Sequence, residues 1–353
     1  MIGGEFPFAF TDILNAENRQ LVFPDVYAYS SGRAALFQIL KFLRQEKGVS
    51  CILLPDYLCS SILVPINALG LECSFYPIDE RLELEETGFA ELYRKKSAVL
   101  LINYFGLQDL GTQIKAIRGI DADAIIIEDD VQAYYEFKKP LNGVDFKFTS
   151  LRKTFAVPDG GLVKTKHNLP IVETPNTCGQ YKAAAALLKS MREGNFNDNI
   201  FLELFEKGES LIDEEQEYGM SLIAEKLYSY VDEERVKVRR LNNASYLLDQ
   251  LNRLGIKPLL PLTDNHVPLF IPVVLNNRNE VRKALFKQEI FCPVHWPLEG
   301  MQVRRGELMS KTELSLIIDQ RYGHNDMESI IAILKENLNE IKKQGLHSNS
   351  STF

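Results

Sequence analysis

Between residues 26 and 165 the chain alternates short apolar runs with amphipathic stretches, and this alternation limits the possible folds more than any other feature. The runs are rich in Ile, Leu and Val without regular polar positions, which is typical of strands covered on both faces. Strands that alternate with helices predict βαβ units and an α/β fold around a mostly parallel sheet. The predicted strands are 51–55, 73–78, 98–104, 124–129, 146–150 and 161–165.

The later part of the chain has a different pattern. Residues 177–255 contain long amphipathic stretches, the last of which breaks near Asp232 and ends at Gly255. An apolar run and two further helical stretches then predict a smaller α+β domain. A chain of 353 residues suits one large domain and one small one. We therefore predict a large domain over residues 1–235, a small C-terminal domain over 236–345 and a disordered polar tail over 346–353.

Composition excludes several classes of protein. With 45% hydrophobic and 25% charged residues the chain is typical of a globular protein, and its net charge of −8 argues against nucleic acid as a partner. No apolar run reaches the roughly 18 residues of a membrane helix, and the start MIGGEFPFAF lacks the basic region of a signal peptide. Five cysteines without CxxC spacing predict reduced thiols and no metal site. We expect a cytoplasmic protein with neither a nucleic-acid nor a membrane partner.

The segment YSSGRAALFQILKFL (29–43) is a polar turn that runs directly into an amphipathic helix. Ser30 or Ser31 can cap this helix, and Gly32 lets the backbone approach a ligand, so that free N–H groups and the helix dipole point at a bound anion. Arg33 favours such a site, because a cation in the first turn opposes the dipole unless an anion offsets it. The alternative is a plain N-cap followed by a core helix.

Three acidic residues, Glu128, Asp129 and Asp130, stand at the end of the predicted strand 124–129. Ligands of open α/β sheets bind outside the carboxyl ends of the strands. Clustered carboxylates have raised pKa values unless a cation or a protonated ring compensates them. A Mg²⁺ site is one alternative, although no nearby His or Cys supports it and Mg²⁺ sites usually come with the motifs of phosphate chemistry. A solvated acidic turn is the other alternative.

Lys153 follows the next predicted strand and stands 24 residues after Asp129. A lysine becomes a useful nucleophile or base when burial or nearby cations lower its pKa from about 10.4 towards roughly 7 to 8, and Arg152 would act in that direction. The alternative is a surface lysine whose charge extends into water. An anion cradle, a carboxylate and a lysine together are the parts that pyridoxal phosphate requires.

Five segments, in order along the chain, resemble motifs of the DegT/StrS family, a group of fold type I aminotransferases that aminate keto-sugar nucleotides. They are SSGRAAL, IIEDDVQA, SLRKTFAVPDGG, FCPVHWPL and SLIIDQRYGHNDMESI. The resemblance implies the pyridoxal-phosphate fold type I architecture, in which an aspartate-aminotransferase-like large domain carries the cofactor. It also implies a homodimer, since the active sites of the family lie at the subunit interface.

The same resemblance implies roles for individual residues. Lys153 would form the Schiff base with pyridoxal phosphate and Asp129 would pair with the pyridine nitrogen, so these two are the expected catalytic residues. The expected cofactor-binding residues are Ser31, Gly32, Arg33, Tyr57, Asp129, Gln132, Ser150 and Lys153. Tyr57 is the residue nearest to the position of the family's ring-stacking aromatic. The residues expected at the substrate end are His295, Trp296, Arg321 and Tyr322.

The chain departs from the family's motifs near the cofactor phosphate. Only two residues separate Ser150 from Lys153, where the family has four. Arg33 replaces a threonine of the phosphate turn, and Gly219 stands where the family has the arginine by which a second subunit reaches the phosphate. Arg33 or Arg152 could supply this missing charge.

The resemblance predicts transfer of an amino group, usually from glutamate, to a keto-sugar nucleotide. The alternatives are a pyridoxal-phosphate enzyme acting on a non-nucleotide substrate, and a non-catalytic binding or regulatory protein that keeps the fold. Lys153 disfavours dehydration, because sugar dehydratases of this fold carry histidine in its place. A nicotinamide enzyme is disfavoured because no G-x-G-x-x-G segment follows a predicted strand.

Overall fold

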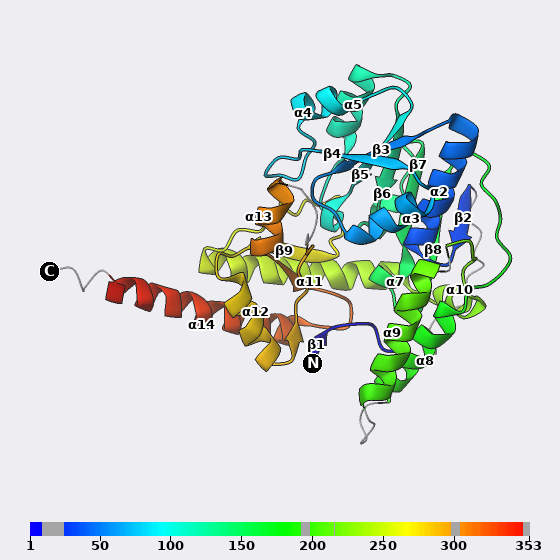
Figure 1. The fold of residues 1–353 in the computed structure, drawn as a ribbon. Helices are drawn as coiled ribbons and strands as arrows, with labels where there is room; N and C mark the ends of the chain where they lie inside the picture. Colours follow the sequence, from blue (N-terminus) through cyan, green and yellow to red (C-terminus); the bar gives the residue numbers. More distant parts are fainter. Residues whose placement is uncertain (9–24, 192–197, 215, 298–303, 349–353) are drawn as a thin grey trace.

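A computed structural model describes residues 1–8, 25–191, 198–214, 216–297 and 304–348 (Figure 1). Its main feature is a seven-stranded sheet with the order β2-β8-β7-β6-β5-β3-β4. All neighbours pair in parallel except at β8, which is antiparallel to both β2 and β7. The strands are β2 (Val26–Tyr29), β3 (Cys51–Pro55), β4 (Glu72–Tyr76), β5 (Ser97–Ile102), β6 (Ile125–Asp129), β7 (Phe146–Ser150) and β8 (Gly161–Thr165).

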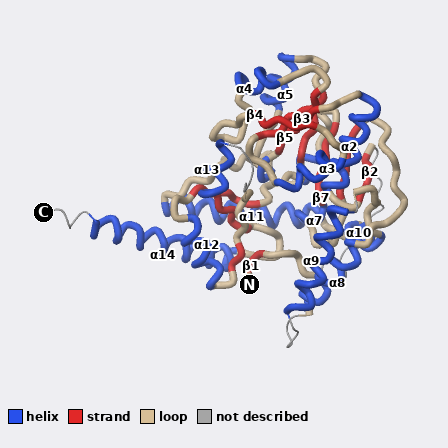
Figure 2. The backbone as a smooth tube through the Cα atoms, in the orientation of Figure 1, coloured by secondary structure: helices blue, strands red, loops and turns tan. Residues whose placement is uncertain are grey.

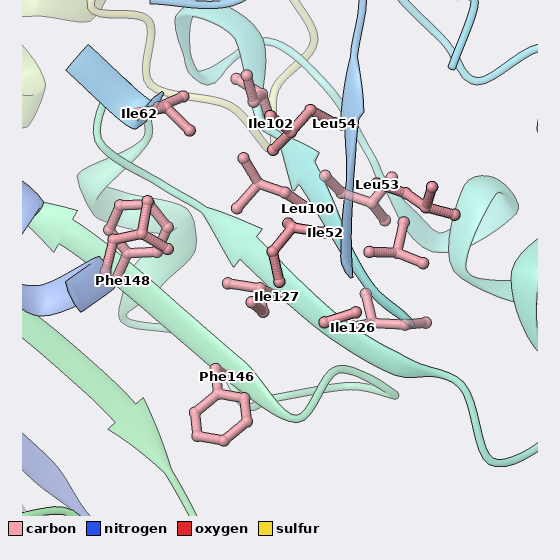
Figure 3. Packing of buried hydrophobic residues seen from close by; sticks show 14 of the residues in the cluster. Ile52, Leu53, Leu54, Ile62, Leu100, Ile102, Ile126, Ile127, Phe146 and Phe148 are labelled. Atoms are coloured by element: carbon pink, nitrogen blue, oxygen red, sulfur yellow. The ribbon is translucent and has the colours of Figure 1, made fainter. Parts of the chain in front are cut away.

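The predicted α/β fold with a mostly parallel sheet is confirmed, and each predicted strand overlaps an observed one. Strand β2 was not predicted, because its short sequence VYAY has only one fully buried residue and lacks the continuous apolar run of the central strands. The central strands carry the core that Figure 3 shows, in which aliphatic side chains of β3, β5 and β6 pack together.

Helices cover the sheet, as Figure 2 shows, with helices in blue around strands in red. The longest of them, α2, follows β2 and packs on β7 and β8. Its buried residues include Ala34, Ala35, Leu36, Ile39, Leu40 and Leu43, which is the amphipathic spacing that the sequence predicts. The helices of this part are α2 (Gly32–Lys47), α3 (Leu63–Ala68), α4 (Glu86–Leu92), α5 (Gly111–Ile120), α6 (Tyr134–Phe137) and α7 (Leu151–Thr154).

The helical region predicted after residue 177 is present. Helices α8 (Cys178–Ser190) and α9 (Asp198–Glu214) lie side by side (Figure 1) and are followed by α10 (Leu222–Tyr228). The predicted break near Asp232 is the start of α11 (Glu233–Leu254), where the Asp232 side chain accepts a hydrogen bond from Arg235 N. Gly255 ends this helix at φ 73°, a backbone conformation that glycine adopts without strain.

The C-terminal part contains the antiparallel pair β9 (Phe270–Val274) and β11 (Glu313–Ile317). Its helices α12 (Arg278–Lys287) and α14 (His324–Ser348) pack on each other, α14 also packs on α11, and α13 (Arg304–Thr312) precedes β11. The short strand β10 (Ile290–Phe291) pairs in parallel with β1 (Ile2–Gly3), so the N-terminal residues lie against this part. The domain boundary at residues 235 and 236 stays a prediction. The predicted tail 346–353 overlaps the end of α14, and its remainder lies outside the described residues.

Candidate active site

A cavity of about 380 Å³ lies at the carboxyl edge of the sheet. Its walls come from β6, β7, the start of α2, α9, the N-terminal residues and the C-terminal part. Of the residues predicted for the site, it is lined by Ser31, Gly32, Arg33, Asp129, Gln132, Ser150, Lys153, His295, Trp296 and Arg321. Tyr57 and Tyr322 are not part of the lining. The fold thus brings most of the predicted residues together from positions as far apart as 31 and 321.

The start of α2 forms one end of the cavity. Ser31 caps the helix, and its Oγ accepts a hydrogen bond from Ala34 N at 3.1 Å. A Cβ atom on Gly32 would lie 3.2 Å from Ser150 Cβ, so a larger residue would crowd the serine that ends β7. The first N–H groups of a helix have no partner within it, and no acidic residue lies in this first turn. This end of the cavity therefore suits an anion.

Asp129, at the end of β6, is the carboxylate that faces the cavity. It is only 5% exposed, and its Oδ1 accepts a hydrogen bond from Val131 N at 2.9 Å. Burial raises its pKa to about 7. Within the described part of the chain no basic side chain forms an ion pair with it. A buried carboxylate in this state is suited to a positively charged partner.

The other two acidic residues of the segment face away from the cavity. Lys147 on β7 lies 3.1 Å from Glu128 and 3.8 Å from Asp130. All three side chains are buried, so they form an internal ionic cluster below the site. The alternative of a solvated acidic turn is therefore wrong for this segment. The described residues contain no group of three or more His, Cys, Asp or Glu that could hold a metal ion.

Lys153 reaches the cavity from the short helix α7. Asp129 and Lys153 meet because β6 and β7 are parallel neighbours whose carboxyl ends lie at the same edge of the sheet. The side chain of Lys153 contacts solvent through the cavity. Arg152 and then burial lower its pKa, which favours the neutral amine that a nucleophile needs.

Both arginines considered for the phosphate already have carboxylate partners on α9. Arg152 lies 2.9 Å from Glu209, and Arg33 pairs with Asp213. The carboxylate of Asp213 thus offsets the cation in the first turn of α2. Glu209 also pairs with the buried Lys182 of α8. Although burial opposes ionisation of Glu209, Arg152 and Lys182 hold its pKa at about 2.

Glu209 lines the cavity and was not predicted as a site residue. The sequence around it predicts only an amphipathic helix, and nothing local to α9 shows that this helix lies across the start of α2. A glutamate within a helix is usually solvated, so only its contacts with Arg152 and Lys182 distinguish it. Only its tertiary contacts, and no local sequence pattern, therefore identify Glu209 as a residue of the site.

Tyr57 lies behind the cavity wall and does not line it. It is fully buried, its ring stacks on Tyr104 at a centroid distance of 5.7 Å, and its hydroxyl donates a hydrogen bond to the carbonyl of His295. Cys59 and Ser61, from the same segment after β3, line the cavity in its place. The segment after β3 therefore presents Cys59 and Ser61 to the cavity, two and four residues beyond Tyr57, the residue predicted to stack on the ring.

Gln132 lines the cavity and is fixed by a hydrogen bond, in which its Oε1 accepts from Phe105 N at 2.9 Å. Trp296 packs near Phe105 with a centroid distance of 6.5 Å and nearly parallel rings. Phe105 is fully buried behind the cavity wall and supports both of these lining residues.

Arg321 is held by Asp319 and by the N-terminal residues. Its Nη2 lies 2.7 Å from Asp319 Oδ2, and it donates hydrogen bonds to the carbonyls of Gly4 and Glu5. The hydroxyl of Tyr322 accepts a hydrogen bond from Gly3 N at 2.7 Å. The structure therefore gives Tyr322 a role in anchoring the N-terminal residues and does not place it on the cavity wall.

Comparison with known proteins gives different results for sequence and for structure. No family model matches the chain, and no curated protein matches its sequence. A putative sugar aminotransferase from Streptococcus pneumoniae, in its apo form, superposes with a TM-score of 0.69 at 14% identity, over 98% of this chain and 99% of that chain. The chain has the fold of sugar aminotransferases.

Two further solved structures agree. A sugar aminotransferase from Micromonospora echinospora superposes with a TM-score of 0.64 at 15% identity, over 89% of this chain and 87% of that chain. A DegT DnrJ EryC1 StrS aminotransferase from Brucella abortus gives a TM-score of 0.59 at 16% identity, over 88% and 85%. The predicted fold type I architecture is confirmed by these structures and by the seven-stranded sheet. None of the described helices has the length and apolar character needed to cross a membrane.

Proposed function

We propose that this chain is a pyridoxal-phosphate-dependent aminotransferase that transfers an amino group from glutamate to a keto-sugar nucleotide. The observation that carries the proposal is the meeting of Lys153, Asp129 and the start of α2 in one cavity. An amine, a buried carboxylate and an anion cradle are the three groups that bind the reactive aldehyde, the pyridine nitrogen and the phosphate of this cofactor.

The residues present fit the cofactor. Asp129 is buried, and in the described chain no cation is paired with it, so a protonated pyridine nitrogen would supply the missing positive charge. Gly32 leaves room beside Ser150 at the start of α2, where a phosphate group can accept hydrogen bonds from helix N–H groups. The cavity volume of about 380 Å³ lies in the range of small-molecule sites.

Each residue then has a definite task. Pyridoxal phosphate supplies, when bound, an aldehyde for covalent attachment and a ring that delocalises electrons. Lys153 Nζ would hold the cofactor covalently and would accept and donate the proton that the transfer requires. Asp129 keeps a proton on the pyridine nitrogen. The apolar side chains of Phe148, Phe270 and Trp296 line the cavity and limit the access of water.

Solved structures with this fold support the choice of cofactor. The Streptococcus pneumoniae protein is known in PLP and PMP forms, which superpose on this chain with TM-scores of 0.67 and 0.63. The nucleotide-linked acceptor, the glutamate donor and a homodimeric assembly rest on the motif resemblance. A cytoplasmic location rests on the cysteine pattern and the composition of the sequence.

The test begins with the purified full-length chain and added pyridoxal phosphate. We expect a yellow protein in which borohydride reduction leaves the cofactor attached to Lys153, as a mass spectrum of the peptides would show. L-glutamate should then convert the bound cofactor to its amino form, seen as loss of the visible absorbance. A panel of UDP-linked and dTDP-linked keto-hexoses would identify the acceptor.

Three outcomes would redirect the proposal. A colourless protein that does not take up pyridoxal phosphate would favour the non-catalytic binding protein. Cofactor uptake with turnover of only non-nucleotide ketones would favour the second enzyme hypothesis. A cofactor attached to a lysine other than Lys153 would contradict the assignment of the site.

A further inference from the structure

Three side chains form a chain of hydrogen bonds that ends at the cavity wall. Glu313 and Ser315 lie on β11 and are fully buried, and His295 lies in the segment after β10. Ser315 Oγ donates to Glu313 Oε1 at 2.5 Å, and His295 Nδ1 lies 2.8 Å from Ser315 Oγ. The three side chains therefore connect an internal carboxylate to a residue that lines the cavity.

The direction of these hydrogen bonds assigns the tautomer of His295. A serine hydroxyl has one proton, and Ser315 donates it to Glu313. Ser315 Oγ must then accept from His295, so Nδ1 carries the ring proton and Nε2 is an acceptor. The second oxygen of Glu313, Oε2, accepts a hydrogen bond from His295 N at 2.7 Å, which holds the carboxylate in this orientation.

The ring of His295 is held in place, and none of the described residues binds its Nε2. Phe105, Phe270 and Trp296 surround the ring at centroid distances of 5.6, 5.3 and 5.2 Å. Across the described residues Nε2 has no hydrogen-bond partner, and His295 belongs to the cavity lining. Burial, and then the charge of Lys153, lower the pKa of His295 to about 3, so the ring stays neutral in the physiological range.

We propose that Glu313 and Ser315 hold His295 as the tautomer whose Nε2 accepts a hydrogen bond from a hydroxyl group of the sugar. His295 is then a substrate-binding residue, and Glu313 and Ser315 are positioning residues that act through it. The inference rests on the proposed function for the identity of the sugar. The tautomer itself follows from the hydrogen bonds once Glu313 is ionised, and burial raises the pKa of Glu313 to about 7. It is therefore tested separately, at a pH above that value.

Glu313→Gln provides a sharp test, because it reverses the direction of the hydrogen bonds. The glutamine oxygen must face His295 N, which can only donate, so the amide nitrogen faces Ser315 and donates to it. Ser315 then donates to Nδ1, and the ring proton moves to Nε2. The variant replaces one carboxylate oxygen by an amide NH2 group, and Glu307→Gln, which makes the same change on the exposed face of α13, is the matched control.

The first measurement is two-bond ¹H–¹⁵N NMR of the full chain labelled on its five histidines, with His295→Asn to assign the signal. We expect a neutral His295 with protonated Nδ1 in the wild-type and Glu307→Gln chains, and protonated Nε2 in Glu313→Gln. The spectra are recorded at about pH 8.5, where Glu313 is ionised. Protonated Nε2 or a charged ring in the wild-type chain at this pH would overturn the assignment. If Glu313→Gln does not fold, Ser315→Ala removes the hydroxyl that selects the tautomer, and we expect a mixture of both tautomers.

The second measurement uses UDP-glucose, dTDP-glucose and their analogues in which one sugar hydroxyl is replaced by fluorine. Fluorine cannot donate a hydrogen bond, so one analogue should bind the wild-type chain about tenfold more weakly than the parent sugar nucleotide. In Glu313→Gln this discrimination should disappear. Equal binding of all analogues, or discrimination that survives in Glu313→Gln, would overturn the inference. Failure of the proposed function would show itself differently, as the absence of cofactor on Lys153 in the wild-type chain.

Discussion

Replacing Asp129 by asparagine should change two properties in opposite directions, namely the stability of the cofactor-free protein and its affinity for the cofactor. Burial raises the pKa of this carboxyl from 3.8 to about 7 in the folded chain. The folded state therefore binds the proton more tightly than the unfolded state, and this group lowers stability progressively as the pH rises from 3.8 to 7. Above that range the cost stays constant.

The magnitude follows from the same values. At about 1.4 kcal/mol for each pH unit, the raised pKa of Asp129 costs about 4 kcal/mol at pH 8, where the carboxyl is ionised, and about 1.5 kcal/mol at pH 5, where the folded chain keeps it protonated. An asparagine side chain keeps an oxygen for Val131 N and carries no charge. The Asp129→Asn protein should therefore be more stable than the wild-type protein without cofactor, and its advantage should grow by about 2.5 kcal/mol from pH 5 to pH 8.

Cofactor affinity should move the other way, because the variant cannot pair a negative charge with the protonated pyridine nitrogen. A hydrogen bond to a charged group contributes about 1.5 to 3 kcal/mol, which corresponds to roughly ten- to hundredfold weaker binding. Guanidinium unfolding at both pH values and titration with pyridoxal phosphate measure the two effects, with the exposed Asp123→Asn as control. Equal stability of variant and wild type at pH 8, together with unchanged cofactor affinity, would refute the assignment of Asp129.

Other substitutions test the surroundings of Asp129. Lys153→Ala should abolish both borohydride attachment of the cofactor and transamination, and survival of either activity would exclude this lysine as the reactive amine. Arg152→Met removes the largest cause of the lowered pKa of Lys153, so the pH profile of borohydride trapping should shift to higher pH. An unshifted profile would show that Arg152 does not lower this pKa. Glu209→Gln removes the carboxylate partner of Arg152 and Lys182, so it should tighten binding of inorganic phosphate several-fold, as calorimetry would measure. It should also lower the melting temperature. Weaker phosphate binding would show instead that Glu209 orders these two cations for the anion. Gly219→Arg should destabilise the chain by roughly 2 to 4 kcal/mol in guanidinium unfolding, because a Cβ atom there would lie 2.4 Å from the carbonyl oxygen of Val172; a stable variant with tighter cofactor binding would contradict this.

The sequence predicts the strands that carry the site better than the side chains that surround it. Strands β3, β7 and β8 begin and end at the predicted residues. Strand β3 is a continuous apolar run, whereas β7 (FKFTS) and β8 (GLVKT) mix apolar and polar residues. Asp129 and Lys153 could be predicted as neighbours, because polar residues at the ends of neighbouring parallel strands must meet at one edge of the sheet. Tyr57 could not be placed in this way, because it lies in an irregular segment after β3 where a shift of two residues exchanges the cavity wall for the core.

The local sequence pattern by itself determined the α/β class, the helix cap at Ser31 and the end of α11 at Gly255. It also determined the pair of catalytic candidates Asp129 and Lys153. Each of these features depends on residues close together in the chain. Tertiary structure alone decided which cations remain free for an anion, since Arg33 and Arg152 meet carboxylates from α9 at positions about 60 to 180 residues away. It also decided the tautomer of His295, which depends on Glu313 and Ser315 of another strand. Charge pairing and proton position depend on atoms brought together by folding, so no run of the sequence contains them.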